Sequence, residues 1–154
     1  MIFKGSLFRS AQSLQPLIMS QITILFVDDH PLIRKAWAFL LSQDSRFKLI
    51  AECESGEMAV ELAKQLYPDI IIMDIRLRGM SGIEATQLIK ESCPKTKIIG
   101  LSFHHLPEFP KKIMHSGAMG YLSKTSPPEE IFKAIIEVQK GGSYVCEAMA
   151  GKII

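Results

Sequence analysis

A chain of 154 residues is long enough for one domain, since a chain of this length buries about two thirds of its unfolded surface. Its 47% apolar and 22% charged residues are typical of a folded globule and exclude an intrinsically disordered chain. Lys4 and Arg9 account for the net charge of +2, so the neutral remainder offers no broad basic face for nucleic acid.

Residues 1–20 are predicted to be a disordered leader. They contain no acidic residue, and Lys4 and Arg9 interrupt the apolar run that a secretory signal would need. Two other interpretations stay open: an upstream start codon with Met19 as the working start, and a transit peptide, which this basic segment weakly resembles. No apolar run approaches the ~20 residues that cross a bilayer, so no membrane association is expected.

From residue 21 to residue 143, strand-like and helix-like patterns alternate five times. Continuous apolar runs predict strands that are buried on both faces, and apolar residues at helical spacing predict amphipathic helices. The expected strands are 22–27, 47–53, 69–74, 97–102 and 119–122, and the expected helices are 31–43, 56–66, 82–92, 108–116 and 127–140. This alternation predicts an α/β fold, a doubly wound five-stranded parallel sheet with helices on both faces. The more mixed strand 47–53 is expected at an edge.

Two helix starts carry capping-box signals, in which a serine and a glutamate three residues later satisfy free N–H groups. Ser81 and Glu84 form one such pair. Ser126 and Glu129 form the other, with Pro127 expected at the first helical position.

The helix expected at 108–116 has the weakest pattern. Pro107 and Pro110 lie near its start, where they would delay or shorten it. A plain loop is an equal alternative for this segment.

The three cysteines, Cys53, Cys93 and Cys146, are odd in number and far apart in the chain. With no C-x-x-C pair, they argue against a disulfide framework or a zinc site. They fit a reducing compartment, so we expect the protein to be cytoplasmic.

Polar residues follow the expected strands at the points where those strands end. Asp28 and Asp29 come after the first strand, Asp74 ends the third, and Ser102 and Lys124 follow the fourth and fifth. Because parallel strands share one carboxyl edge, all five should open onto the same rim. Three carboxylates there would repel one another, which predicts a bound cation and chemistry on one of them.

These residues and their spacing resemble the receiver domains of two-component response regulators. The matching text is Val27-Asp28-Asp29-His30-Pro31, Ile72-Met73-Asp74 with Gly82 eight residues later, Leu101-Ser102, and Gly120-Tyr121-Leu122-Ser123-Lys124. The resemblance covers about residues 21–143 and implies the flavodoxin-like strand order 2-1-3-4-5. The close of this region resembles regulators that continue into a helix-turn-helix DNA-binding domain, so residues 144–154 are expected to begin a linker to an output domain.

The resemblance implies that Asp74 accepts a phosphoryl group from a histidine kinase or a phosphotransfer protein. A carboxylate nucleophile would form an acyl phosphate, with charge neutralisation as the main aid. Asp28, Asp29, Asp74 and the backbone carbonyl of Arg76 would hold Mg²⁺, a cation that takes oxygen ligands.

Ser102 and Lys124 would contact the phosphoryl oxygens, with Lys124 as a compact positive charge. Tyr121 matches the aromatic switch position, which turns inward when the serine moves toward the phosphoryl group; a surface tyrosine is the alternative. Arg76 and His104 occupy positions that influence the dephosphorylation rate in the family. The family also implies a homodimer on phosphorylation, and no direct nucleic-acid contact by this segment is expected.

The sequence departs from the family at two places. Arg78 stands where a proline is usual, and Thr125 follows Lys124 where proline is frequent. The adjacent His104 and His105 also suggest a metal site, although two neighbouring residues rarely share an ion without further ligands.

Two other functions conflict with the sequence, and one alternative stays open. A flavin carrier needs N–H donors after its first strand, whereas this loop is anionic and contains Pro31. A phosphohydrolase of the haloacid dehalogenase type needs an aspartate where Arg76 stands. A receiver-like interaction module that is never phosphorylated, or a stand-alone receiver, stays as the alternative to a switch that controls transcription.

Overall fold

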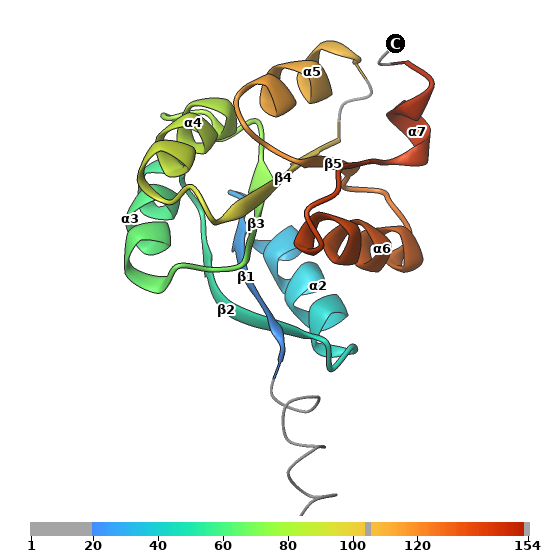
Figure 1. Ribbon diagram of the computed structural model, residues 1–154, viewed down its shortest axis with the longest axis horizontal. Helices are drawn as coiled ribbons and strands as arrows, with labels where there is room; N and C mark the ends of the chain where they lie inside the picture. The colour runs from blue at the N-terminus through green and yellow to red at the C-terminus, as the bar shows by residue number, and fades with distance from the viewer. Residues whose placement is uncertain (1–19, 104–105, 153–154) are drawn as a thin grey trace, which may run out of the picture.

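A single parallel sheet forms the centre of the molecule (Figure 1). The computed structural model describes residues 20–103 and 106–152. The strands within these residues are β1 (Ile22–Val27), β2 (Phe47–Cys53), β3 (Ile70–Asp74), β4 (Lys97–Ser102), β5 (Gly120–Ser123) and β6 (Tyr144–Val145). The helices are α2 (Pro31–Ser42), α3 (Gly56–Leu66), α4 (Gly82–Ser92), α5 (Glu108–His115), α6 (Pro128–Gln139) and α7 (Glu147–Ala150).

The strand order is β2-β1-β3-β4-β5-β6, and every neighbouring pair is parallel. All five residues of β3 are buried, as are the last four of β1, which explains their continuous apolar sequence. The more mixed β2 lies at an edge of the sheet, as predicted. The predicted order 2-1-3-4-5 is confirmed for the first five strands.

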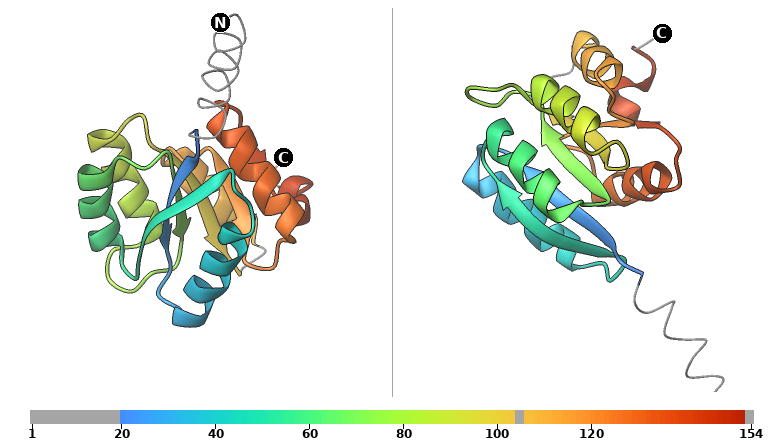
Figure 2. Two further views of the ribbon diagram at one scale, coloured as in Figure 1. Left: turned by 90° about the horizontal axis from the view of Figure 1, so that it is seen from below. Right: turned by 60° about the vertical axis from the view of Figure 1, so that its left-hand side comes forward.

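Helices cover both faces of the sheet (Figure 2). Helices α3, α4 and α5 lie on one face, and α2 and α6 lie on the other. The residues of α6 that face the sheet repeat at helical spacing and are all buried: Ile131, Ala134, Ile135 and Val138. The segment with two prolines forms α5, so the helix interpretation is confirmed over the loop. Pro110 is tolerated there because it lies in the first turn, where an N–H has no helical partner.

The serine half of one predicted capping box is confirmed, and the other capping box is wrong. Ser81 Oγ accepts a hydrogen bond from the Glu84 N–H at 3.1 Å. Helix α6 instead begins at Pro128, with Pro127 as its cap. The residue before a proline is held in extended conformation, so Pro127 cannot be helical. Ser126 Oγ therefore turns back, accepts from the Ser123 N–H at 3.1 Å and donates to Glu130 Oε1 at 3.2 Å.

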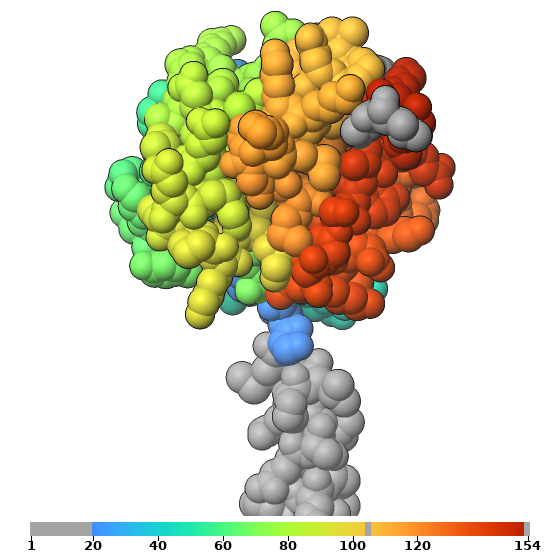
Figure 3. All heavy atoms as spheres, turned by 45° about the horizontal axis from the view of Figure 1, so that its top comes forward, coloured from blue at the N-terminus to red at the C-terminus, as the bar shows by residue number. Residues whose placement is uncertain are grey.

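The sheet has a sixth strand that the sequence did not predict. Residues 144–145 form β6 beside β5, and the Cys146 N–H donates to the Tyr121 carbonyl at 2.9 Å. Cys146 and Met149 are fully buried, and Figure 3 shows the red C-terminal segment lying directly against the orange α5–β5 region. These contacts extend the packed unit beyond residue 143. A linker to an output domain stays a prediction.

Two other expectations concern the ends and the cysteines. Residues 1–19 of the predicted leader lie outside the described residues. Cys53, Cys93 and Cys146 are buried free thiols. None of the helices in the described ranges combines the length and apolar character that crossing a membrane requires.

Candidate functional site

The carboxyl edge of the sheet carries the predicted polar cluster. Asp28 follows β1 directly, Asp74 ends β3, Ser102 ends β4, and Lys124 follows β5. Because these strands are parallel, their ends meet at one rim. A shallow pocket of about 300 Å³ there is lined by Asp29, His30, Asp74, Arg76, Arg78, Ser102, Phe103 and Lys124. The structure thus brings together the described residues that the sequence singled out.

Lys124 links two carboxylates at the centre of this rim. Its Nζ donates to Asp74 Oδ2 at 3.0 Å and lies 2.7 Å from Asp28 Oδ2. The Lys124 side chain is only 2% exposed, and the Phe103 ring covers it with its centroid 5.0 Å from Nζ. The backbone holds it in place, because the Lys124 N–H donates to the Ser102 carbonyl at 3.0 Å. One buried ammonium therefore balances two of the three carboxylates.

The Asp74 carboxyl group has an unusual environment for an aspartate. Burial, reinforced by the neighbouring Asp28 carboxylate, raises the pKa of Asp74 to about 6 despite the contact with Lys124. Its Oδ1 accepts from the Arg76 N–H at 3.1 Å, which fixes one oxygen. Its other oxygen faces Lys124, within the rim pocket.

Asp28 is held from several directions. Its N–H donates to the Cys53 carbonyl at 3.1 Å, and its own carbonyl accepts from Arg34 Nη1 at 2.7 Å. The His30 N–H donates to Asp28 Oδ1 at 2.9 Å, and His30 Nδ1 lies 2.8 Å from the same oxygen. His30 belongs to the sequence motif, but the motif predicts no role for it in the cluster. Its position directly after the two aspartates was the available signal.

Two carboxylate oxygens at the rim indicate that the cluster suits a cation. Asp28 Oδ2 and Asp29 Oδ1 are buried, with Lys124 Nζ 2.7 Å from the first and His30 Nδ1 3.1 Å from the second. The carboxylates of Asp28, Asp29 and Asp74 therefore crowd around the buried Lys124 ammonium. Carboxylates gathered in this way are the ligands that hard divalent cations take, so the donor set fits Mg²⁺.

The predicted switch residues lie next to each other in the core. Tyr121 is fully buried, so the surface alternative is wrong, and its phenol hydrogen-bonds with the Ser102 side chain. Burial raises the pKa of Tyr121 to about 12, so the phenol is uncharged at neutral pH. Ser102 lines the rim pocket on its other side, which connects the carboxylate cluster to Tyr121. The predicted His104, and His105 beside it, lie outside the described residues.

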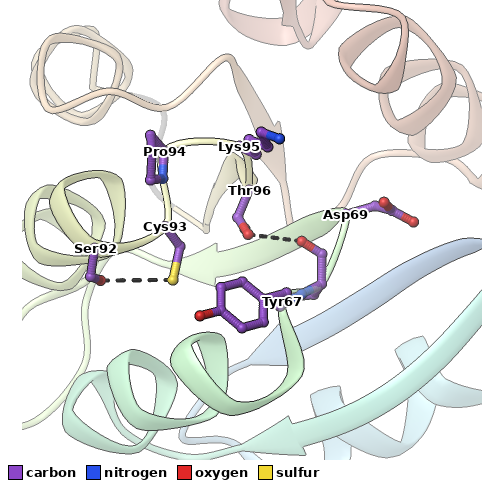
Figure 4. A pocket seen from close by; sticks show the side chains of 8 residues that line it. Tyr67, Asp69, Ser92, Cys93, Pro94, Lys95 and Thr96 are labelled. Atoms are coloured by element: carbon purple, nitrogen blue, oxygen red, sulfur yellow. Dashed lines mark hydrogen bonds between the residues drawn. The ribbon is translucent and has the colours of Figure 1, made fainter.

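A second cavity of about 380 Å³ lies at the opposite edge of the sheet (Figure 4). The Tyr67 ring, Cys93 and the loop before β4 line it. The Thr96 hydroxyl donates to the Pro68 carbonyl at 2.9 Å, and this bond joins the two loops. The cavity holds none of the rim carboxylates that the chemistry needs.

Comparison with known proteins decides the family. The family model described as "Response regulator receiver domain" matches residues 24–136. The chain belongs to this family. It is a receiver domain of two-component signalling rather than a turnover enzyme, and its acidic cluster is typical of the family's magnesium site.

Similar proteins include both sequences and solved structures. Response regulator UvrY of Escherichia coli (strain K12) is 37% identical over 84% of this chain and 59% of its own length. Transcriptional regulatory protein DegU of Brevibacillus brevis is 34% identical over 82% of this chain and 53% of its own length. A crystal structure of a LuxR-family two-component response regulator from Aurantimonas sp. SI85-9A1 has a TM-score of 0.83 at 32% identity, covering 87% of this chain and 96% of that one. The chain therefore spans little more than half the length of these two curated relatives.

Proposed function

We propose that this receiver is a switch that accepts a phosphoryl group on Asp74 and relays it as a conformational change. The observation that carries the proposal is the buried contact of Asp74 Oδ2 with Lys124 Nζ at 3.0 Å. An Asp74 oxygen would attack phosphorus while the bond from phosphorus to a donor histidine nitrogen breaks, and that nitrogen regains a proton. The donor would be a histidine kinase or a phosphotransfer protein.

The neighbouring residues have separate roles in this proposal. Asp28, Asp29, Asp74 and the Arg76 carbonyl would hold Mg²⁺, which supplies charge neutralisation at the phosphoryl oxygens. Lys124 would stay with one phosphoryl oxygen, because its ammonium is already anchored by Asp28 at 2.7 Å.

Ser102 would turn from Tyr121 toward another phosphoryl oxygen. The Tyr121 ring, already buried, would turn further inward into the space that the serine leaves. Phosphorylation can shift this equilibrium only by its differential stabilisation of the two states. Arg76 and His104 are proposed to tune the lifetime of the phosphorylated form.

The phosphorylation step is tested by weighing the intact protein. With acetyl phosphate and Mg²⁺, the wild type should gain about 80 Da, the mass of one phosphoryl group. Asp74→Asn should show no adduct, since an amide oxygen cannot form the acyl phosphate. Asp69→Asn is the matched control. Asp69 directly precedes β3, at the opposite end of the strand from Asp74, and its carboxylate accepts hydrogen bonds from Thr23. The Asp69→Asn variant should therefore still gain the phosphoryl adduct.

The opposite results have clear meanings. An unmodified wild type would favour an interaction module that is never phosphorylated. An undiminished adduct on Asp74→Asn would place the acceptor elsewhere.

We further propose that the whole protein controls transcription through an output domain, as the name of the relative DegU indicates for that protein. Reading the coding sequence after Ile154 tests this, and an unrelated or absent domain there would contradict it. Phosphorylation is also expected to favour a homodimer. Light scattering before and after acetyl phosphate should record a doubling of mass, and an unchanged mass would contradict it.

A further inference from the structure

The His30 ring lies inside the acidic cluster. Its Nδ1 is 2.8 Å from Asp28 Oδ1, 3.1 Å from Asp29 Oδ1 and 3.3 Å from Lys124 Nζ. One ligand atom from each of Asp28, Asp29, His30 and Asp74 can be chosen so that all four lie within 4.8 Å of one another. The imidazole nitrogen thus shares the space that the carboxylates surround.

These spacings match those between ligands of one ion. Adjacent ligands in an octahedral site, each about 2.1 Å from the ion, lie about 3.0 Å apart. The two distances from Nδ1 to carboxylate oxygens fall on either side of that value. The carboxylates of Asp28, Asp29 and Asp74 supply oxygen ligands in the same cluster, so the donor set as a whole suits a divalent cation.

The backbone explains why the ring stays over the rim. A residue before proline is held in extended conformation, and His30 before Pro31 has φ −96° and ψ 110°. The imidazole and the Phe103 ring form a T-shaped pair, with the ring centroids 6.4 Å apart. About half of the His30 side chain remains exposed, so the ring can adjust without repacking the core.

We propose that His30 Nδ1 is a ligand of the divalent cation and shifts the preference of the site from Mg²⁺ toward cations that favour nitrogen. This inference rests on the proposed cation site of the switch. Imidazole is a good ligand for cobalt, nickel and zinc, whereas Mg²⁺ prefers oxygen and retains water. Removing the nitrogen should therefore weaken Co²⁺ binding far more than Mg²⁺ binding.

His30→Phe tests the proposal, because it keeps an aromatic ring beside Phe103 and removes both ring nitrogens. Untagged, metal-free protein is titrated calorimetrically with Mg²⁺ and with Co²⁺, well above the usual histidine pKa of about 6.5. Co²⁺ affinity should fall about tenfold or more, and Mg²⁺ affinity less than about threefold. His115→Phe, an exposed histidine in the last turn of α5, is the matched control and should change neither affinity.

A spectroscopic measurement reports the ligand directly. Pulsed electron paramagnetic resonance of the Mn²⁺-loaded wild type should show coupling to a histidine nitrogen, and His30→Phe should lack it. Equal losses of Co²⁺ and Mg²⁺ affinity, or a nitrogen coupling that persists in the variant, would overturn the proposal. The proposed function fails separately, by the absence of the Mg²⁺-dependent phosphoryl adduct on the wild type.

Discussion

Replacement of Gly82 by alanine is expected to cost at least ~3 kcal/mol of the free energy of unfolding. A Cβ at this position would overlap the Asp74 carbonyl oxygen and lie 2.9 Å from Ile75 Cα. Both obstacles are backbone, so no side chain can turn away to make room. The start of α4 is also tied to the end of β3, because the Gly82 N–H donates to the Ile75 carbonyl at 3.0 Å.

Urea unfolding followed by the fluorescence of Trp37, the single tryptophan, measures this loss. Gly151→Ala is the matched control, since nothing lies within 4 Å of a Cβ added there, and it should stay within about 0.5 kcal/mol of the wild type. Because the clash pushes on Asp74 itself, the folded fraction of Gly82→Ala should also take up phosphoryl groups more slowly. A variant as stable as the wild type would show that β3 and α4 can separate freely at this point.

The sequence was sufficient for the parts of this molecule that depend on local pattern. The apolar run Ile70–Asp74 predicts a strand buried on both faces, and all five of its residues are buried in β3. Once the strands are parallel, Asp28, Asp74 and Lys124 must meet at one rim, so that part of the site followed from topology alone.

Other features depend on contacts between distant segments. Strand β6 has only two residues, too few for any periodicity, and it forms because Tyr121 in β5 offers it a backbone partner. The direction of the His30 ring and the buried state of Tyr121 likewise depend on Phe103 and Ser102, which come from a different strand end. Sequence spacing carries no information about such side-chain directions.

The second large effect concerns stability without divalent cations: Asp74→Asn is expected to be more stable than the wild type at neutral pH. The folded-state pKa of Asp74, about 6, exceeds its ordinary value of 3.8. Between these values the folded protein holds a proton that the unfolded chain has released, so stability falls as pH rises from about 4 to about 6. Above that range the loss in the free energy of unfolding is constant, on the order of 2–3 kcal/mol. An asparagine cannot ionise, so Asp74→Asn does not suffer this loss.

Urea unfolding in chelator across pH 4 to 8 checks this, with Asp69→Asn as the matched control. Asp69 Oδ2 accepts from the Thr23 N–H at 2.8 Å and the Thr23 hydroxyl at 3.0 Å, so its substitution should destabilise the protein. Adding Mg²⁺ should stabilise the wild type more than Asp74→Asn, because the cation compensates the negative charge of the Asp74 carboxylate.

The opposite outcome would be an Asp74→Asn variant that is less stable than the wild type at pH 7 and whose free energy of unfolding changes with pH as the wild type's does below pH 6. Asp74 would then carry no electrostatic strain. The Lys124 ammonium would then fully compensate the carboxylates of Asp28 and Asp74. The expected result instead makes the cluster a site whose repulsion is relieved by a cation, and such charge neutralisation is what transfer of a phosphoryl group to Asp74 requires.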